Sequence, residues 1–292
     1  MSAQFEGTPA DVLAGRARFA VVHGNSWRVR RSLPSGSIDV DLSDPPYSSG
    51  GMTRGDRTKS TDTKYTQSGS QGRRPDFTGD AMDGRAWSRW CVMWMEEARR
   101  CATADGRLAA FIDWRQLPAM TDAVQAAGWI WRGIVPWNKG EGSRPNPGGF
   151  RSQCEFIVWA STGPLPAPVP GVLILPGCFS AAVKQDDKHH QTGKPTSLMR
   201  DLVKLCPPGG VIFDGYAGSG TTAAAALMEG RRVIAVERSE EYYRVALERC
   251  RAAAEGRRAD VRFGDGVLDT SSAVRVEAPE WGALFDAREV RP

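Results

Sequence analysis

Short apolar runs alternate with amphipathic stretches along most of this chain. The runs are of strand length and are bounded by polar or glycine-rich turns, which is typical of strands buried in an α/β sheet. The predicted strands are residues 38–42, 108–113, 129–137, 155–159, 211–213 and 232–236, and the predicted helices are 87–95, 117–127, 196–205, the stretch from 223 and the stretch from 240. We expect 129–137 and 155–159 to pair as a hairpin at the sheet edge. The tryptophan-rich stretch 87–95 is expected to pack into the core.

Polar, glycine-rich and proline-rich segments divide the chain. We expect a loosely ordered lead-in at residues 1–18, one domain at 19–266, and a tail at 267–292 that carries no interpretable motif. Within the domain, segments 48–80, 140–153 and 163–188 are predicted loops. Long loops inside compact domains are usually functional or disordered. Contact with a ligand is therefore the favoured interpretation of 48–80.

Composition narrows the class of protein without identifying it. With 292 residues, of which 41% are hydrophobic, the chain is long enough to bury a full α/β core. Lysine and arginine exceed aspartate and glutamate by only four, 38 against 34, so net charge does not indicate a nucleic-acid binder. The 6 cysteines are scattered and there are only 3 histidines, so we expect reduced thiols, no metal site and a cytoplasmic protein. No segment predicts a signal peptide or a membrane span.

The tetrapeptide Asp44-Pro45-Pro46-Tyr47 follows the predicted strand 38–42. Open α/β sheets bind ligands at the carboxyl ends of their strands. The Asp44 carboxylate and the Pro45 carbonyl could accept both protons of a nucleobase amino group, which would free the lone pair of that nitrogen for alkylation. Tyr47 could stack on a base that has left the duplex. A stiff exit from a strand is the structural alternative, and four residues alone do not decide between the two.

A second motif, residues 211–222, has the pattern of strand, glycine turn and helix. Gly215, Gly218 and Gly220 permit a tight turn and close approach of the backbone to a ligand. Glu237 ends the next predicted strand, where a carboxylate can accept both hydroxyls of a ribose. The spacing also fits a dinucleotide fingerprint, but too little chain follows Glu237 for a second mononucleotide half. A P-loop is excluded because no Gly-Lys-Ser/Thr follows the turn.

A third motif, His190-Gln191-Thr192-Gly193-Lys194-Pro195, precedes the predicted helix 196–205. The tetrapeptide resembles motif IV, and this third motif resembles motif X, of the amino-methylating DNA methyltransferases. The glycine turn and motif X adjoin, both downstream of the tetrapeptide, which is the order of the β group, the DNA methylase N-4/N-6 family. The resemblance covers roughly residues 19–251. It implies a doubly wound, Rossmann-like methyltransferase sheet with an antiparallel edge hairpin, permuted so that the catalytic half comes first.

The resemblance also implies which residues form the site, since each role is assigned to the residue that matches the family motif. Asp44, Pro45, Pro46 and Tyr47 would form the catalytic loop, and S-adenosyl-L-methionine (SAM) would be the cofactor. The expected cofactor-binding residues are Asn25, Lys194, Pro195, Asp214, Gly215, Tyr216, Ala217, Gly218, Ser219, Gly220, Thr221, Glu237 and Arg238. Asn25 stands where the family usually has an acid; Gly264-Asp265 is an alternative, but the surroundings of Asn25 match better.

Double-stranded DNA is the expected partner. The expected DNA-binding residues lie in two basic loops and are Arg54, Arg57, Lys59, Lys64, Arg73, Arg74, Lys139, Arg144, Asn146 and Arg151. Residues 163–188 occupy the target-recognition position of the family and are short, which favours a short or degenerate recognition sequence. Family members are often dimers, so a homodimer is an open expectation.

The predicted reaction is methyl transfer from SAM to an exocyclic amino group of DNA, in the setting of restriction–modification in a bacterium or phage. Asp44 favours adenine N6, because the cytosine N4 enzymes of the family more often have serine at that position. Cytosine N4 methylation is the first alternative. An RNA methyltransferase, a protein-amide methyltransferase and a catalytically silent DNA-binding protein are the others.

Overall fold

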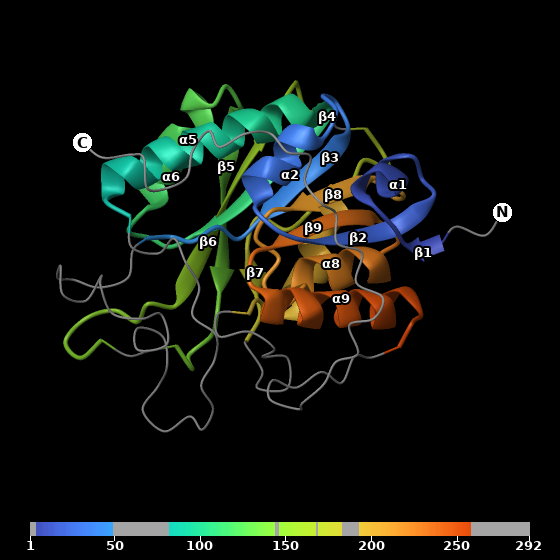
Figure 1. Cartoon of the computed structure of the whole chain (residues 1–292). Helices are drawn as coiled ribbons and strands as arrows, with labels where there is room; N and C mark the ends of the chain where they lie inside the picture. Colours follow the sequence, from blue (N-terminus) through green and yellow to red (C-terminus); the bar gives the residue numbers. More distant parts are fainter. Residues whose placement is uncertain (1–3, 49–81, 144–145, 168, 183–192, 258–292) are drawn as a thin grey trace.

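The computed structural model describes residues 4–48, 82–143, 146–167, 169–182 and 193–257 (Figure 1). Within these ranges a single 9-stranded sheet has the order β1-β2-β9-β8-β3-β4-β6-β5-β7. The strands are β1 (Gln4–Glu6), β2 (Ala17–His23), β3 (Ile38–Ser43), β4 (Ala102–Ile112), β5 (Ile130–Asn138), β6 (Cys154–Ser161), β7 (Phe179–Ser180), β8 (Val211–Asp214) and β9 (Arg232–Glu237).

Helices cover both faces of this sheet, as predicted for a doubly wound fold (Figure 1). They are α1 (Pro9–Leu13), α2 (Ser26–Ser32), α5 (Gly84–Cys101), α6 (Leu117–Ala126), α7 (Thr196–Leu202), α8 (Thr221–Met228) and α9 (Glu240–Ala254), with a 3-10 turn η2 (Val203–Leu205) after α7. None of the helices in the described ranges has the length and apolarity that a bilayer span requires.

Alternate residues of the central strands enter separate cores on the two faces. On β8, Ile212 packs with α7, α8 and α9, whereas Val211 and Phe213 pack against α1 and α2. On β4, Phe111 belongs to the first core, and Leu108 belongs to a third cluster beneath α5 and α6. Both faces of these strands are therefore buried, which explains their nearly continuous apolar sequence. The tryptophan-rich helix is core, as expected.

The strands β8 and β3 pair in parallel, with Val40 opposite Ile212, and the chain leaves them towards opposite sides of the sheet. From β8 the chain proceeds to β9 on one side, and from β3 it proceeds to β4 on the other. Such a switch point leaves a crevice beyond the carboxyl ends of the two strands, where ligands of open α/β sheets bind. The order is the predicted permuted one, with the Asp-Pro-Pro-Tyr strand preceding the glycine-turn strand.

The predicted hairpin is present, but it is not the outermost part of the sheet. β5 and β6 pair antiparallel, and β6 joins the hairpin to β4. The short strand β7 adds to the outer side of β5, with Phe179 opposite Trp137. The indole of Trp137 donates to the carbonyl of Ala181 at 2.9 Å, which anchors the segment after β7 to β5.

The expectation of a loosely ordered lead-in at residues 1–18 was wrong for residues 4–18. β1 pairs with β2, and α1 begins at a capping box in which Thr8 and Asp11 satisfy each other's backbone amides. Glu6 is held by Arg251 of α9 at 2.8 Å. The cap is formed within a short polar stretch, and the ion pair joins segments far apart in sequence, so hydrophobic periodicity did not reveal either.

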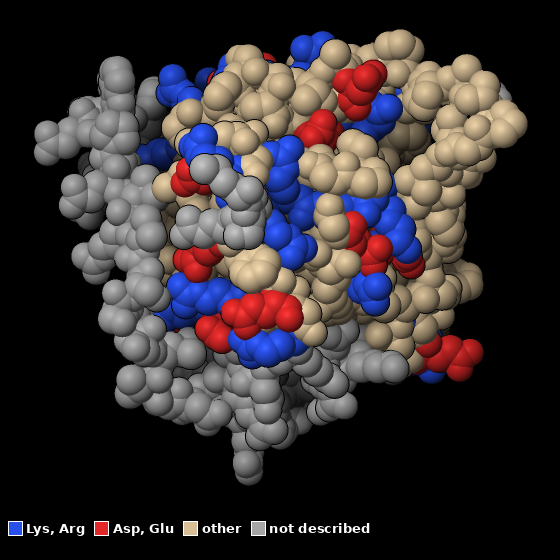
Figure 2. All heavy atoms as spheres, turned by 90° about the vertical axis from the view of Figure 1, so that its right-hand side faces the viewer, with Lys and Arg blue, Asp and Glu red and all other residues tan. Residues whose placement is uncertain are grey.

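Several arginines bind carbonyls where helices end, at the edge of the sheet opposite the crevice. Arg18 donates to Ala254 O of α9 and Leu227 O of α8 at 3.1 and 2.9 Å. Arg232 binds Val12 O of α1. Figure 2 shows this side of the molecule, where lysine and arginine form a band with acidic side chains beside it. Many arginines therefore stabilise the fold. This agrees with the conclusion that net charge does not indicate whether the protein binds nucleic acid.

A buried ion pair supports the switch point. Arg30 of α2 and Asp41 of β3 are 1% and 3% exposed, and Arg30 Nη2 lies 2.7 Å from Asp41 Oδ2. The Arg30 guanidinium lies over the Phe213 ring, 4.4 Å from its centroid. Ser43 Oγ donates to the other oxygen of Asp41 at 2.7 Å and accepts from Gly215 N at 3.4 Å. Ser43 therefore links the buried ion pair to the backbone of the glycine turn.

Asp41→Leu should destabilise the protein by about 3–5 kcal/mol, because it leaves the Arg30 charge buried without a partner. The double variant Arg30→Met/Asp41→Leu should recover most of that loss, since it removes both charges. Urea unfolding of the two variants and the wild type measures both effects. If the double variant were no more stable than the single one, the uncompensated charge would not be the cause.

Candidate active site

The sequence motifs converge at the carboxyl ends of neighbouring parallel strands. Asp44 directly follows β3, Asp214 ends β8, Glu237 ends β9, and Asn25 follows β2. Lys194 precedes Pro195, the N-cap of α7, and lies at the same edge. Parallel pairing brings these ends together although the residues are far apart in the chain. The predicted catalytic loop and the predicted cofactor loop are therefore neighbours in space.

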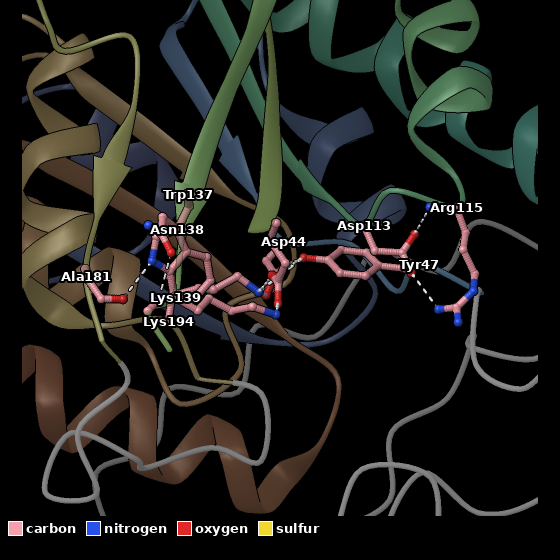
Figure 3. A network of polar contacts seen from close by, with 11 residues as sticks. Asp44, Tyr47, Asp113, Arg115, Trp137, Asn138, Lys139, Ala181 and Lys194 are labelled. Carbon is pink, nitrogen blue, oxygen red and sulfur yellow. Dashed lines mark hydrogen bonds and ion pairs between the residues drawn. The ribbon is translucent and has the colours of Figure 1, made fainter. Parts of the chain in front are cut away.

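The Asp44 carboxylate is bound on both oxygens. Tyr47 donates its hydroxyl to Oδ1 at 2.7 Å, and Lys194 donates from Nζ to Oδ2 at 2.7 Å. Lys194 Nζ also donates to the Tyr47 hydroxyl at 3.2 Å, which closes a three-membered network (Figure 3). Burial, followed by the neighbouring carboxylates Asp44 and Glu155, raises the pKa of the Tyr47 hydroxyl well above its usual value. Tyr47 therefore remains a protonated donor.

Glu155, on β6, joins two lysines to this network. Its carboxylate lies 3.3 Å from Lys194 Nζ and 3.1 Å from Lys139 Nζ. Burial by itself would raise the pKa of Glu155, but Lys194 and Lys139 lower it by more, so the group is anionic. Burial by itself would lower the pKa of Lys194, yet Asp44 and Glu155 raise it above its usual value. The cluster thus contains two cations and two anions.

Packing fixes this cluster and the loop that carries Asp44. The Lys194 ammonium lies 4.9 Å from the ring centroid of Phe111 and 5.9 Å from that of Trp137, so it sits among aromatic faces. Trp87 of α5 donates its indole N–H to the Pro46 carbonyl at 2.8 Å. Hydrogen bonding to Pro46 and ring-restricted φ at both prolines hold the tetrapeptide in one conformation.

The Glu237 carboxylate organises the glycine turn. Its two oxygens accept from Gly218 N at 2.8 Å and from Ser239 N at 2.7 Å. Each carboxylate oxygen can accept more than one hydrogen bond, so acceptor capacity remains for ligand hydroxyls. On the neighbouring side, Asn25 follows β2 and caps α2 by accepting from Trp27 N at 2.9 Å. The Arg238 carbonyl lies 3.1 Å from His23 Nε2, which ties the end of β9 to the end of β2.

Helix α9 holds the glycine turn from the opposite side. Gly220 has φ +80°, and a Cβ placed there would lie 2.8 Å from Ala246 Cα. Arg249, only 5% exposed, donates to Ser219 O at 2.8 Å and to the hydroxyl of Thr221 at 3.0 Å. No side chain caps α8 at Gly220, so the first backbone amides of this helix lack a side-chain acceptor among the described residues.

Two predicted cofactor residues are placed differently from the rest. The Tyr216 ring packs at 5.8 Å from Trp90 and 6.0 Å from Trp94, so only its backbone belongs to the turn. Lys194 was predicted to lie beside the cofactor; in the structure its ammonium binds the Asp44 carboxylate. Ala217 is buried within the turn, and Pro195 is the N-cap of α7.

The predicted DNA-binding residues are only partly described. Outside the described residues lie Arg54, Arg57, Lys59, Lys64, Arg73, Arg74 and Arg144. Asn146 donates to Phe150 O at 2.8 Å, and Arg151 donates to Glu141 O at 2.8 Å, so both brace their own loop. Lys139 is in the cluster with Glu155. DNA contact by these residues stays a prediction.

Three residues of the site were missed in the sequence. Glu155 was assigned only as part of a strand, Arg249 as part of the polar side of a helix, and Trp87 as core. A charged residue at the start of an otherwise apolar strand was a signal for Glu155. Nothing local distinguished Arg249 from the other arginines of α9.

Comparison with known proteins gives a consistent result. Residues 38–169 and 172–248 match the model of the N6/N4 methyltransferases, described as DNA methylase. YubD of Escherichia coli (strain K12), provisionally named a methylase, is 28% identical over 233 residues, which are 79% of this chain and 89% of YubD. The type II methyltransferase M.HinfI of Haemophilus influenzae is 24% identical over 258 residues, 79% of this chain and 68% of M.HinfI.

Solved structures share the fold. TTHA0409 from Thermus thermophilus, in complex with SAM, aligns with a TM-score of 0.57 at 20% identity, over 81% of this chain and 96% of that chain. Because the identity is low, this similarity concerns the architecture alone.

Gly220→Ala should destabilise the protein more than Gly230→Ala. Both glycines have positive φ, +80° and +72°, but nothing lies within 4 Å of a Cβ at Gly230. Gly230→Ala should cost about 1–2 kcal/mol of backbone strain, and Gly220→Ala about 1–3 kcal/mol more from the clash with α9. Urea unfolding compares them. Equal losses would mean that α9 does not constrain the turn.

Asp214→Asn should change how stability depends on pH. Burial raises the pKa of the Asp214 carboxyl to about 7, against hydrogen bonds from Thr222 and Tyr216 N that lower it. Because the pKa of Asp214 is higher in the folded than in the unfolded protein, the protonated carboxyl stabilises the fold fully at pH values below the unfolded pKa. This stabilisation is lost as the pH rises towards 7. Relative to Asp214→Asn, the wild type should therefore lose roughly 2–4 kcal/mol between about pH 4 and about pH 7.

Urea unfolding at several pH values measures this difference. Asp201→Asn is the matched control, because Asp201 is 48% exposed in its pair with Lys204 and should follow the wild type. Parallel pH profiles for the wild type and Asp214→Asn would contradict the assignment of the raised pKa to Asp214.

Proposed function

The chain belongs to the DNA methylase family, and from that premise we propose that it transfers the methyl group of SAM to the exocyclic amino group of a flipped base in DNA, with adenine N6 as the target. A single observation carries this proposal. The Asp44 loop and the glycine turn adjoin at the switch point between β3 and β8. One loop suits the nucleobase amino group, and the other suits the cofactor.

The residues around the glycine turn fit SAM. Gly218 has φ +51° and Gly220 has φ +80°, which permits a close backbone approach. The uncapped amino end of α8 favours a carboxylate such as that of the methionine moiety. Glu237 would accept the ribose hydroxyls, with Asn25 and Arg238 beside it. When bound, SAM supplies an electrophilic methyl group.

The catalytic loop would prepare the amino nitrogen. In a free base the lone pair of this nitrogen is delocalised into the ring, which makes it a weak nucleophile. Asp44 would accept one amino proton and the Pro45 carbonyl the other, in directions that favour a tetrahedral nitrogen. Tyr47 would support the base face. Lys194, at 2.7 Å, holds the Asp44 carboxylate in place for the incoming base.

Adenine is preferred to cytosine on one ground. The first residue of the tetrapeptide is Asp44, whereas the cytosine N4 enzymes that the sequence resembles more often have serine there. The matched family includes both reactions. Cytosine N4 is therefore the second candidate. The setting proposed is restriction–modification, as the name of M.HinfI suggests for that relative.

Nucleoside mass spectrometry of DNA incubated with the purified protein and isotope-labelled SAM tests the reaction. Labelled N6-methyladenine is expected. Labelled N4-methylcytosine would keep the reaction class and overturn the base assignment. Absence of label from every DNA nucleoside would contradict the proposal.

Two variants separate catalysis from cofactor binding. Asp44→Ala should lower methylation by at least about a hundredfold while retaining SAM binding, because it removes an acceptor for the amino group. Glu237→Ala should weaken SAM binding by about tenfold or more, because two hydroxyl contacts and the turn depend on it. Calorimetry with SAM measures the binding. Undiminished methylation by Asp44→Ala, or undiminished SAM binding by Glu237→Ala, would remove the corresponding assignment.

A further inference from the structure

Lys194 and Asp44 present a hydrogen-bond donor and an acceptor side by side. Lys194 Nζ lies 2.7 Å from Asp44 Oδ2, and Lys194 is 7% exposed. The ammonium has three protons to donate, and the carboxylate has only acceptors. A ligand that donates to Asp44 can therefore accept from Lys194 through an adjacent atom.

The Tyr47 hydroxyl satisfies both groups in this structure. It donates to Asp44 Oδ1 at 2.7 Å and accepts from Lys194 Nζ at 3.2 Å. An adenine or cytosine edge has the same polarity, because its amino group donates and the adjacent ring nitrogen accepts. Guanine and thymine have the opposite polarity, with a carbonyl oxygen and a ring N–H. The pair therefore complements the two bases that carry an amino group on the pairing edge beside an acceptor nitrogen.

We propose that Lys194 donates a hydrogen bond to the ring nitrogen beside the target amino group, so that Asp44 and Lys194 together select adenine or cytosine over guanine and thymine. This inference rests on the proposed methyl transfer and assigns Lys194 to the base rather than to the cofactor. On base entry, the base edge replaces the Tyr47 hydroxyl between the two groups. The freed Tyr47 ring can then pack on the base.

Glu155 is the positioning residue in this scheme. Its carboxylate lies 3.3 Å from Lys194 Nζ on one side and 3.1 Å from Lys139 Nζ on the other. Phe111 and Trp137 border the ammonium, so Lys194 has few other places to direct its protons. Glu155 keeps Lys194 charged and beside Asp44 even while the base occupies the carboxylate.

A ring-nitrogen deletion in the substrate tests the contact directly. The substrate is a duplex oligonucleotide with the sequence that the enzyme methylates, and its target adenine is replaced by 1-deazaadenine, which has C–H in place of the ring nitrogen. If the methylated base is cytosine, 3-deazacytosine serves instead. For adenine, 7-deazaadenine is the matched control, because it leaves the pairing edge intact and should be methylated like adenine.

The wild type should lose about tenfold to about a hundredfold in kcat/KM on the 1-deaza substrate, as expected for loss of an acceptor from a charged donor. On the natural base, Lys194→Met should have a kcat/KM lower than that of the wild type by a similar factor. Replacing the natural base with the 1-deaza base should then lower the kcat/KM of Lys194→Met only slightly further. Because both enzymes meet the same altered base, the comparison cancels any change in its intrinsic reactivity. Equal penalties in both enzymes, or no penalty in the wild type, would overturn the proposal.

Lys194→Met leaves two carboxylates facing each other, so the double variant Lys194→Met/Glu155→Gln, which removes one charge of each sign, is measured beside it. The kcat/KM of the double variant should also change little when the 1-deaza base replaces the natural base. Both variants should bind SAM like the wild type in calorimetry, and lost SAM binding would return Lys194 to the cofactor site and overturn the inference. If the wild type methylates no base, the proposed function falls as well. A failure confined to the deaza comparison leaves methyl transfer standing.

Discussion

The parallel pairing of β3 with β8 is the constraint on which the rest of the site depends. It places two strand ends side by side at the point where the chain reverses direction, so that Asp44 and the glycine turn share one crevice. The buried Arg30–Asp41 pair, with Ser43 as a bridge to Gly215 N, fixes the two ends relative to each other. A methyl group has to pass between two ligands in line, and this requires rigid loops on adjacent strands.

Charge balance explains how the buried Lys194 can lie beside the Asp44 carboxylate. Two lysines and two carboxylates alternate through contacts of 2.7 to 3.3 Å, so each charge faces an opposite one. The desolvation that would neutralise Lys194 in isolation is thereby offset. The same arrangement directs Asp44 and keeps it ready to accept hydrogen bonds. Loss of one member would leave the others with an unbalanced charge.

Arginine serves mainly structural purposes in the described part of this protein. Arg18 and Arg232 bind carbonyls at helix ends, Arg249 holds the glycine turn, and Arg30 lies in the core. A planar guanidinium with five donors suits such carbonyl-rich sites. Total charge therefore said little about DNA, and any DNA-binding surface has to be assigned from the placement of individual side chains.

The sequence by itself located the strands, the helices and the three motifs, because buried strands, glycine turns and proline-rich loops are local patterns. The class of fold and the permuted order of its two halves followed from the resemblance of those motifs to the DNA methylase N-4/N-6 family. The sequence also located Asp44, Gly218, Gly220 and Glu237 at strand ends or turns. Only the tertiary structure brought Lys194 onto Asp44, added Glu155 from β6, and placed Arg249 against the glycine turn. These contacts join residues 28 to 150 positions apart, and no local periodicity encodes them. Electrostatic partners are chosen by distance in space, and sheet topology sets that distance.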